Sequence, residues 1–446
     1  MVGPAPTHPF RTAAAMPIPP DILDQARDLL AAGRYRVVRR LLVTGGVPPD
    51  DAAGLGLLGA ALVGLNDHHA ARAHLEAALL RTPGDPVLRF HLARALNGLG
   101  MMHAAVPILA DLHGARPADA AVTEALANAL RRDARYEQAI ALVDAAEAQG
   151  RLDHAILYHR ALSWHALGDA AAALADFDRL LADDPGHAAA WFASHACVLD
   201  GQGLPAALSR LRHAAACTGA NRKYAAFLAA YDVLTGGAGT DGAAAASDGR
   251  AAILDGARAL VPHLAPESRL FGLSADLLRF ALSAASVPGL VLEFGVRRGT
   301  SLRHIAAACG QQAHGFDSFE GLPEGWGNEP AGTFSLGAEL PAMPGNVTLH
   351  KGWFAQTLPD FLAAFSGAVR FANIDCDIYS STVTVLTALA PRLVPGTILV
   401  FDEFIGNRTW DAHEFKAFTE FTSRTGMGFR HIAVSPFTGQ VALRLE

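Results

Sequence analysis

The chain has 446 residues, of which 51% are hydrophobic and 18% charged, and its formal net charge is −7 at pH 7. These values exclude a single small module and a wholly disordered chain, and they argue against a broad surface for nucleic acid or anionic lipid. The cysteines show no CxxC pairing, so neither a zinc module nor a disulfide framework is predicted. Apolar runs are too short for a membrane helix, and we expect a cytoplasmic protein with no nucleic-acid or membrane partner.

The front of the chain is predicted to be a leader followed by a pair of helices. Prolines interrupt residues 1–19 before an apolar segment can form, so we expect a disordered leader and not a signal peptide. The segment 20–49 has the pattern of a degenerate helix pair.

A period of 34 residues then governs the first half of the chain, with frames that begin at Ala52, Pro86, Ala120, His154 and Ala188. The twentieth place of each frame holds alanine and the twenty-fourth a larger apolar residue: Ala71, Ala105, Ala139, Ala173 and Ala207, then Leu75, Leu109, Val143, Phe177 and Leu211. Small residues let two antiparallel helices approach closely, and larger ones fill the layer between frames. We therefore predict an all-α helical-repeat solenoid over 20–235, closed by a helix over 222–234.

These frames resemble the tetratricopeptide repeat family. The resemblance implies a concave surface that binds a peptide or another domain. The frames place several first-helix side chains near that groove, although each fits ordinary surface or packing equally well: Phe90, Arg94, Asn97, Asn128, Arg131, Tyr158 and His165. An alanine-rich helical bundle with an accidental period is the alternative.

Residues 236–250 contain only small and polar side chains before the final arginine, and they are predicted to be a linker. Behind them, short β-branched runs alternate with helical segments, which is typical of a parallel sheet with crossover helices. Five parallel strands are followed by two extended runs, FRHIAVS and GQVALRLE, which should pair as an antiparallel hairpin at the sheet's edge. The region 251–446 is thus predicted to be an α/β Rossmann-like domain with a seven-stranded, mostly parallel sheet.

The turn after the first of these strands, EFGVRRGTS, discriminates between cofactors. It is not GxGxxG, because Arg297 stands where a dehydrogenase needs a second glycine beside a pyrophosphate. S-adenosylmethionine has no phosphates and does not impose that demand. Gly295 and Gly299 would let the backbone pass close to its amino-acid moiety, and Glu293 can face its ammonium group. Asp317, which ends the second strand, can accept hydrogen bonds from two ribose hydroxyls.

Together with this turn, four further segments resemble the macrocin O-methyltransferase family: DSFEGLPEGW (317–326), KGWFAQTLP (351–359), IDCDIYSST (374–382) and PRLVPGTILVFDEF (391–404). The resemblance covers about 265–446 and implies a class I methyltransferase that uses S-adenosylmethionine and magnesium to methylate a hydroxyl, with macrolide sugars as the best-known substrates. We add further cofactor contacts from these segments: Thr300, Ser301, Ser318, Trp353 (stacked on adenine) and Asp375.

Four carboxylates follow two neighbouring predicted strands, namely Asp375, Asp377, Asp402 and Glu403. They should converge beside the cofactor crevice and repel one another unless a cation neutralises them, and oxygen-only ligands favour magnesium. All four are predicted metal ligands, and Asp377 is the predicted general base. The family usually has aspartate where Glu403 stands, and solvated carboxylates at strand ends are the alternative. His350, His413 and His431 are less favoured as bases.

The leading hypothesis is an O-methyltransferase that acts on a hydroxyl of a sugar, glycan or glycosylated metabolite, with the repeats recruiting a protein partner or the substrate. A binding scaffold with a degenerate methyltransferase domain is the first alternative, motivated by Glu403. A nicotinamide-dependent oxidoreductase is the second, motivated only by shared topology.

Overall fold

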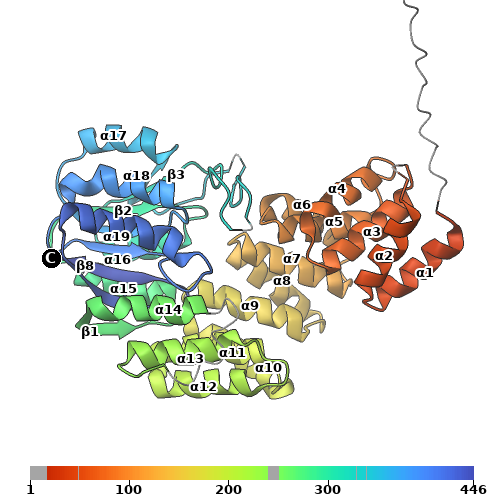
Figure 1. Cartoon of the computed structure of the whole chain (residues 1–446), viewed down its shortest axis with the longest axis horizontal. Coiled ribbons are helices and arrows are strands. Elements are labelled where there is room, and N and C mark those ends of the chain that lie inside the picture. Colours follow the sequence, from red (N-terminus) through yellow and green to blue (C-terminus); the bar gives the residue numbers. More distant parts are fainter. Residues whose placement is uncertain (1–17, 49, 240–250, 328, 338) are drawn as a thin grey trace, which may run out of the picture. The chain divides into compact units, whose positions relative to one another are not determined.

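The computed structural model describes residues 18–48, 50–239, 251–327, 329–337 and 339–446, and the chain divides into two compact units, Met1–Ala125 and Leu126–Glu446 (Figure 1). The predicted leader and linker fall largely on residues 1–17 and 240–250, which lie outside the described residues. The predicted domain bounds, 20–235 and 251–446, stay a prediction. None of the described helices combines the length and the apolar composition that crossing a bilayer requires.

The helices follow the predicted 34-residue period. In all five frames the first helix begins at the first place and the second at the seventeenth: α3 (Ala52–Gly64), α4 (His68–Leu79), α5 (Pro86–Gly98), α6 (Met102–Ala115), α7 (Ala120–Arg132), α8 (Tyr136–Ala148), α9 (His154–Ala166), α10 (Ala170–Asp183), α11 (Ala188–Gln202) and α12 (Leu204–Ala216). The predicted leading pair is α1 (Pro20–Ala31) and α2 (Tyr35–Gly45), and the closing helix is α13 (Lys223–Leu234). The helical-repeat class is confirmed.

The packing follows the predicted division between small and large residues. All five alanines at the twentieth place, and all five apolar residues four places later, are fully buried. At Gly59 an added Cβ would lie 2.5 Å from the side chain of Leu75, so the close approach of α3 and α4 requires a residue without a side chain. Several helices start at an aspartate that caps the first turn; Asp153, for example, accepts a hydrogen bond from the backbone N–H of Ile156 at 2.9 Å.

The α/β region forms one eight-stranded sheet in the order β1-β7-β8-β6-β5-β2-β3-β4. Its strands are β1 (Leu264–Leu270), β2 (Leu290–Phe294), β3 (Ala313–Asp317), β4 (Val347–Lys351), β5 (Val369–Ile374), β6 (Ile398–Phe401), β7 (Phe429–Val434) and β8 (Val441–Leu445). Only the two pairings of β8 are antiparallel. The predicted Rossmann-like class with a mostly parallel sheet is confirmed.

Two details of the predicted sheet are wrong. The strand count is eight and not seven, because β1 pairs parallel with β7; its sequence, LAPESRL, has a proline and three polar residues and lacks the apolar alternation of a strand. The hairpin of β7 and β8 exists, but β8 lies between β7 and β6, and β1 covers the outer side of β7. The hairpin therefore does not form the sheet's edge.

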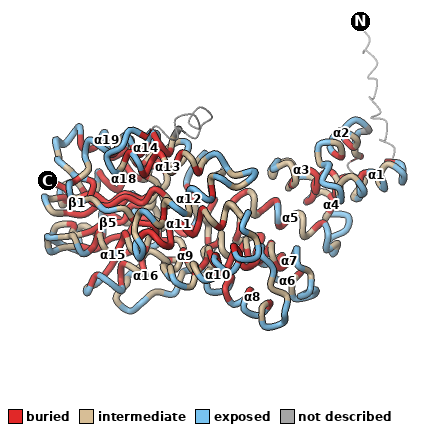
Figure 2. The backbone as a smooth tube through the Cα atoms, turned by 90° about the horizontal axis from the view of Figure 1, so that it is seen from below, coloured by how far each residue is buried: buried red, intermediate tan, exposed pale blue. Residues whose placement is uncertain are grey.

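Helices cover both faces of this sheet, and Figure 2 shows the strands buried between them. On one face α15 (Ser274–Ala284) and α16 (Thr300–Cys309) pack against Val291 and the strand residues that point the same way. On the other face α17 (Phe354–Ala364), α18 (Tyr379–Leu389) and α19 (Glu414–Thr425) pack against Leu292 and Phe294. The remaining helix, α14 (Ala251–Leu260), packs against α13.

The register of the central strands aligns their carboxyl ends. Phe294 of β2 is paired with Ile374 of β5, which is paired with Phe401 of β6. The pairing continues one residue further, because the N–H of Asp375 donates to the carbonyl of Phe294 at 2.8 Å. The loops that follow β2, β5 and β6 therefore begin side by side, and this is where parallel α/β sheets bind ligands.

Candidate active site

The loop after β2 crosses the end of β5 at a distance that only glycine permits. Gly295 has φ +92°, and an added Cβ would lie 1.8 Å from the carbonyl oxygen of Asp375. Its N–H donates to the carbonyl of Phe316 at 2.9 Å. A side chain at this position would push the loop off the strand ends, so glycine is required here by the end of β5, whereas from the sequence a cofactor was expected against it.

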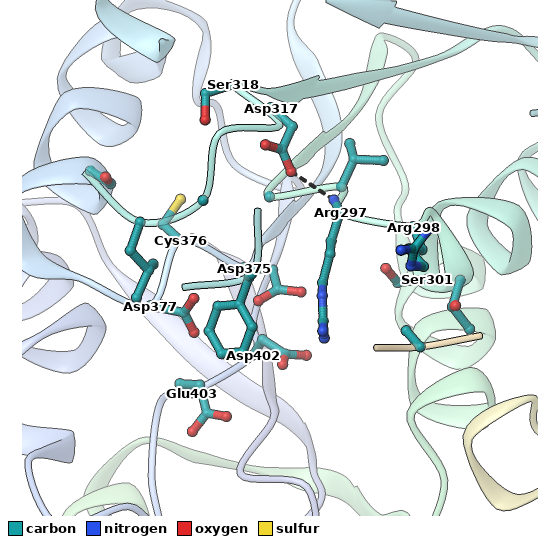
Figure 3. A pocket seen from close by; sticks show the side chains of 18 of the residues that line it. Arg297, Arg298, Ser301, Asp317, Ser318, Asp375, Cys376, Asp377, Asp402 and Glu403 are labelled. Atoms are coloured by element: carbon teal, nitrogen blue, oxygen red, sulfur yellow. Dashed lines mark hydrogen bonds between the residues drawn. The ribbon is translucent and has the colours of Figure 1, made fainter. Parts of the chain in front are cut away.

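Asp317, at the end of β3, holds the loop that follows β2. Its carboxylate accepts hydrogen bonds from the N–H groups of Arg297 and Phe319, each at 2.6 Å (Figure 3). Arg297 has φ +48°, a left-handed conformation that this hydrogen bond helps to hold. Burial raises the pKa of Asp317, and the amide donors oppose that rise. Asp317 thus organises the loop besides lining the crevice.

The four predicted acids point into one space beyond the ends of β5 and β6 (Figure 3). Burial together with the charge of Asp402 raises the pKa of Asp377 to about 7 and that of Asp375 well above its usual range. Burial raises the pKa of Asp402 to about 6, and burial with the charges of Asp402 and Asp377 raises that of Glu403 to about 8. The charges of Asp402 and Asp377 thus make ionisation of their neighbours more costly.

Neutral side chains orient two of these acids. Gln440, on the loop between β7 and β8, donates a hydrogen bond from Nε2 to Asp402 and another to Ser274 Oγ at 2.8 Å. Asn407 Nδ2 donates to Glu403 Oε2 at 3.2 Å. The backbone of Asp377 is in the left-handed conformation, with φ +59°.

A cavity of about 730 Å³ brings most of the predicted residues together. It is lined by Gly295, Thr300, Ser301, Asp317, Ser318, Trp353, Asp375, Asp377, Asp402 and Glu403. Two predicted cofactor residues do not line it. Glu293 is fully buried, and its Oε1 accepts a hydrogen bond from Asn373 at 2.8 Å. Gly299, at φ +74°, precedes α16 and lies against Met343.

The three candidate histidine bases lie elsewhere. His350 stacks on Phe316, and His431 is buried on β7. His413 precedes α19, with its ring 6.4 Å from that of Trp326. None of the three is among the described residues that line the cavity.

The acids suit a hard divalent cation by chemistry and charge. All four present carboxylate oxygens to one cavity, and they form no ion pair with a described lysine or arginine. However, no three His, Cys, Asp or Glu side chains in the described ranges are grouped closely enough to hold a metal ion as they stand. The four carboxylates are therefore the kind of ligand that magnesium prefers, and they must move closer to one another to bind it.

Several residues of the site had no clear signal in the sequence. Glu414, the first residue of α19, is fully buried and accepts hydrogen bonds from the N–H groups of Cys376, at 3.1 Å, and Glu403, at 3.0 Å. It therefore ties together the two loops that carry the acids. Its place at a helix start was the only available hint, since acids are favoured there. Tyr136 of the repeats also lines the cavity without having been singled out, whereas His165, which lines it too, was expected near the repeat groove and not in this site.

Comparison with known proteins identifies the chemistry. Residues 292–404 match the model of a family described as "Methyltransferase domain". The 8-demethyl-8-(2,3-dimethoxy-α-L-rhamnosyl)-tetracenomycin-C 4′-O-methyltransferase of Streptomyces olivaceus is 30% identical over 196 residues, and the match covers 34% of this chain and 69% of that enzyme. The chain belongs to this O-methyltransferase family. The methyltransferase resemblance inferred from the sequence is confirmed, and the oxidoreductase alternative is set aside.

Solved structures similar to this O-methyltransferase fall into two groups. The calicheamicin methyltransferase CalS11 is 27% identical, with a TM-score of 0.33 over 38% of this chain and 77% of that protein. A thermophilic TPR protein of Thermus thermophilus is 23% identical, with a TM-score of 0.36 over 40% of this chain and 97% of that protein.

Proposed function

We propose that this enzyme transfers a methyl group from S-adenosylmethionine to a hydroxyl of a sugar carried by a secondary metabolite. The observation that carries the proposal is the cavity in which a glycine loop, Asp317 and four acids meet at the carboxyl edge of the sheet. The relative from Streptomyces olivaceus, whose name describes methylation of a rhamnosyl group, supports the sugar acceptor.

The cofactor side of the cavity is the loop from Gly295 to Ser301 with Asp317 and Trp353. S-adenosylmethionine supplies an electrophilic methyl group on a sulfonium. Asp317 retains unused lone pairs on both oxygens and can accept hydrogen bonds from ribose hydroxyls. Trp353, at the start of α17, offers a ring for the adenine. The Gly295 backbone leaves room for the amino-acid moiety.

On the acceptor side, Asp377 takes the proton of the reacting hydroxyl. A pKa raised to about 7 suits a general base at neutral pH, because about half of the carboxylate is ionised there and the ionised form is basic enough to accept a proton. The proton would move to a carboxylate oxygen of Asp377 as the hydroxyl oxygen bonds to the methyl carbon, while the methyl carbon–sulfur bond of the donor breaks and its electron pair stays on the sulfur of the departing thioether. Charge is dispersed in this step, so positioning of the two reactants carries much of the rate.

Asp375, Asp377, Asp402 and Glu403 would hold magnesium, which supplies positive charge that favours the ionised acceptor hydroxyl. The rise that Asp402 and Asp377 cause in the pKa values of Asp375 and Glu403 supports this assignment, since a cation removes the repulsion. The repeats would recruit a protein partner or the carrier of the acceptor, as the tetratricopeptide likeness implies.

Magnesium should stabilise chelator-treated protein, and more so at high pH. The raised pKa values mean that the folded protein holds protons on these acids that the unfolded chain releases, so the contribution of the acids to stability is most favourable below about pH 4 and is lost as pH rises towards about 8. We expect added MgCl2 to raise the melting temperature clearly at pH 8 and little at pH 5. The double variant Asp402→Asn/Glu403→Gln should lose this response, and an equal response in that variant would contradict the metal assignment.

The proposed function is tested by titration calorimetry with S-adenosylmethionine and by mass spectrometry of acceptors. We expect saturable cofactor binding and the gain of one methyl group on a rhamnosyl tetracenomycin or on methyl α-L-rhamnoside. The absence of binding at millimolar S-adenosylmethionine would refute the proposed methyltransferase activity and favour the alternative of a binding scaffold. Binding without transfer to any rhamnoside would refute the acceptor class alone.

A further inference from the structure

The helical repeats contribute a wall to the cavity that holds the acids. Tyr136, the first residue of α8, and His165, near the end of α9, line it together with Ala134 and Ala166. All four belong to the same compact unit as the sheet, Leu126–Glu446. The side chains that face the methyltransferase residues across this cavity are therefore repeat residues.

A network of buried polar contacts fixes this wall against the loop that follows β2. Arg298 forms an ion pair with the carboxylate of Asp133, and its Nε donates to the carbonyl of Asp133 at 2.6 Å. Arg297 donates to the carbonyl of Arg132 at 2.7 Å. The Asp133 side chain is only 2% exposed and also pairs with Arg135 at 2.8 Å. Since Asp133 precedes Tyr136 by three residues, these bonds place the start of α8 relative to the cofactor loop.

Tyr136 presents a polar group that the protein does not use. Its phenol forms no hydrogen bond with any residue in the described ranges, although the ring lines the cavity. Burial and the charges of Asp402 and Asp375 raise its pKa, against the effect of Arg297 and Arg131, so the hydroxyl keeps its proton at neutral pH. It can therefore donate to, and accept from, an uncharged ligand oxygen.

His165 adds a neutral surface beside Tyr136. The residue is 8% exposed, its Nε2 is buried without a hydrogen-bond partner among the described residues, and burial lowers its pKa to about 4. Its ring lies 5.0 Å from that of Phe437, which also lines the cavity. In the cavity that the acids line, the repeats thus offer uncharged rings and the hydroxyl of Tyr136, which suits a sugar face better than a charged group.

We infer that Tyr136 is a specificity-determining residue that hydrogen-bonds a hydroxyl of the acceptor sugar adjacent to the one methylated. This inference rests on the proposed function and extends it, because the repeats then form part of the acceptor site besides any role in recruitment. A neutral hydrogen bond of this kind changes kcat/KM by about three- to tenfold. Cofactor binding should be unaffected.

The test compares wild type, Tyr136→Phe and the control Tyr158→Phe, in which the hydroxyl removed lies on α9 outside the cavity lining. Acceptors are methyl α-L-rhamnoside and its analogues that lack one of the neighbouring hydroxyls. We expect kcat/KM of Tyr136→Phe on the complete sugar to be about three- to tenfold lower than that of wild type, mainly through KM. On the deoxy analogue that lacks the hydroxyl contacted by Tyr136, the variant and wild type should have equal kcat/KM. The melting temperature and cofactor Kd of Tyr136→Phe should match wild type, and Tyr158→Phe should behave as wild type.

A merely structural role for Tyr136 would lower activity equally on every acceptor. That result, or unchanged kinetics of Tyr136→Phe on all of them, would overturn the inference while the proposed function stands. Wild-type enzyme that binds cofactor but methylates no rhamnoside would overturn this inference together with the sugar acceptor class of the proposed function, and would leave the methyltransferase assignment in place.

Discussion

Replacing Asp377 with asparagine should lower kcat for methyl transfer by about 10²–10⁴-fold, the usual contribution of a general base. Asparagine is nearly isosteric and tolerates the φ of +59° at this position, so the loop geometry should survive. The amide cannot take the acceptor's proton. The pH profile of wild-type kcat should contain a rise where Asp377 loses its proton, at a lower pH with magnesium bound than without it, and the variant should lack this rise.

The control is Asp411→Asn, an exposed aspartate ahead of α19 that does not line the cavity. It should keep wild-type kcat and the wild-type pH profile. The Kd of Asp377→Asn for S-adenosylmethionine, measured by calorimetry, should stay within a few fold of wild type. Activity of Asp377→Asn near the wild-type level would refute the role of Asp377 as the base.

Replacing Asp317 with alanine should weaken S-adenosylmethionine binding by about 10- to 100-fold. The substitution removes acceptors for the ribose hydroxyls and also frees the N–H groups of Arg297 and Phe319, whose hydrogen bonds hold the loop. Hydrogen bonds to a charged group contribute about 1.5–3 kcal/mol each. Asp317→Asn should bind poorly too, because one side-chain oxygen becomes an N–H donor that faces a backbone donor.

Calorimetry measures this effect, and Asp360→Asn, an exposed acid on α17, is the matched control. With cofactor at saturation, Asp317→Ala should recover much of its kcat, in contrast to Asp377→Asn. Cofactor affinity of Asp317→Ala equal to that of wild type would show that Asp317 only shapes the loop.

Local patterns in the sequence were sufficient for the repeats and for the order of the strands. Helices begin at Ala52 and His154, where the repeat frames predicted them. The frames could be recognised because two packed neighbouring helices need a small residue where they cross and an apolar residue one turn later. The four acids could also be placed together from sequence, since they follow strands whose carboxyl ends share one edge. By contrast, β1 was missed because an edge strand need not bury an alternating face.

Residues whose roles depend on contacts across long stretches of chain could not be predicted. Glu414 lies 38 residues from Cys376 and bridges two loops only because α19 returns over the strand ends. Gln440 reaches Asp402 because β8 inserts beside β6. Glu293 was expected to face the cofactor; it is fully buried and bonded to Asn373 of β5, 80 residues away, and its role as a cofactor contact stays a prediction.

The sequence by itself determined the two kinds of architecture, the methyltransferase motifs and the set of acids, because each depends on periodicity or on neighbours within a few residues. Only the tertiary structure decided which side chains share the cavity, above all Tyr136, which lies more than 150 residues before the glycine loop. The physical reason is that the wall of the cavity is set by long-range contacts, such as that of Asp133 with Arg298, and no local pattern encodes them.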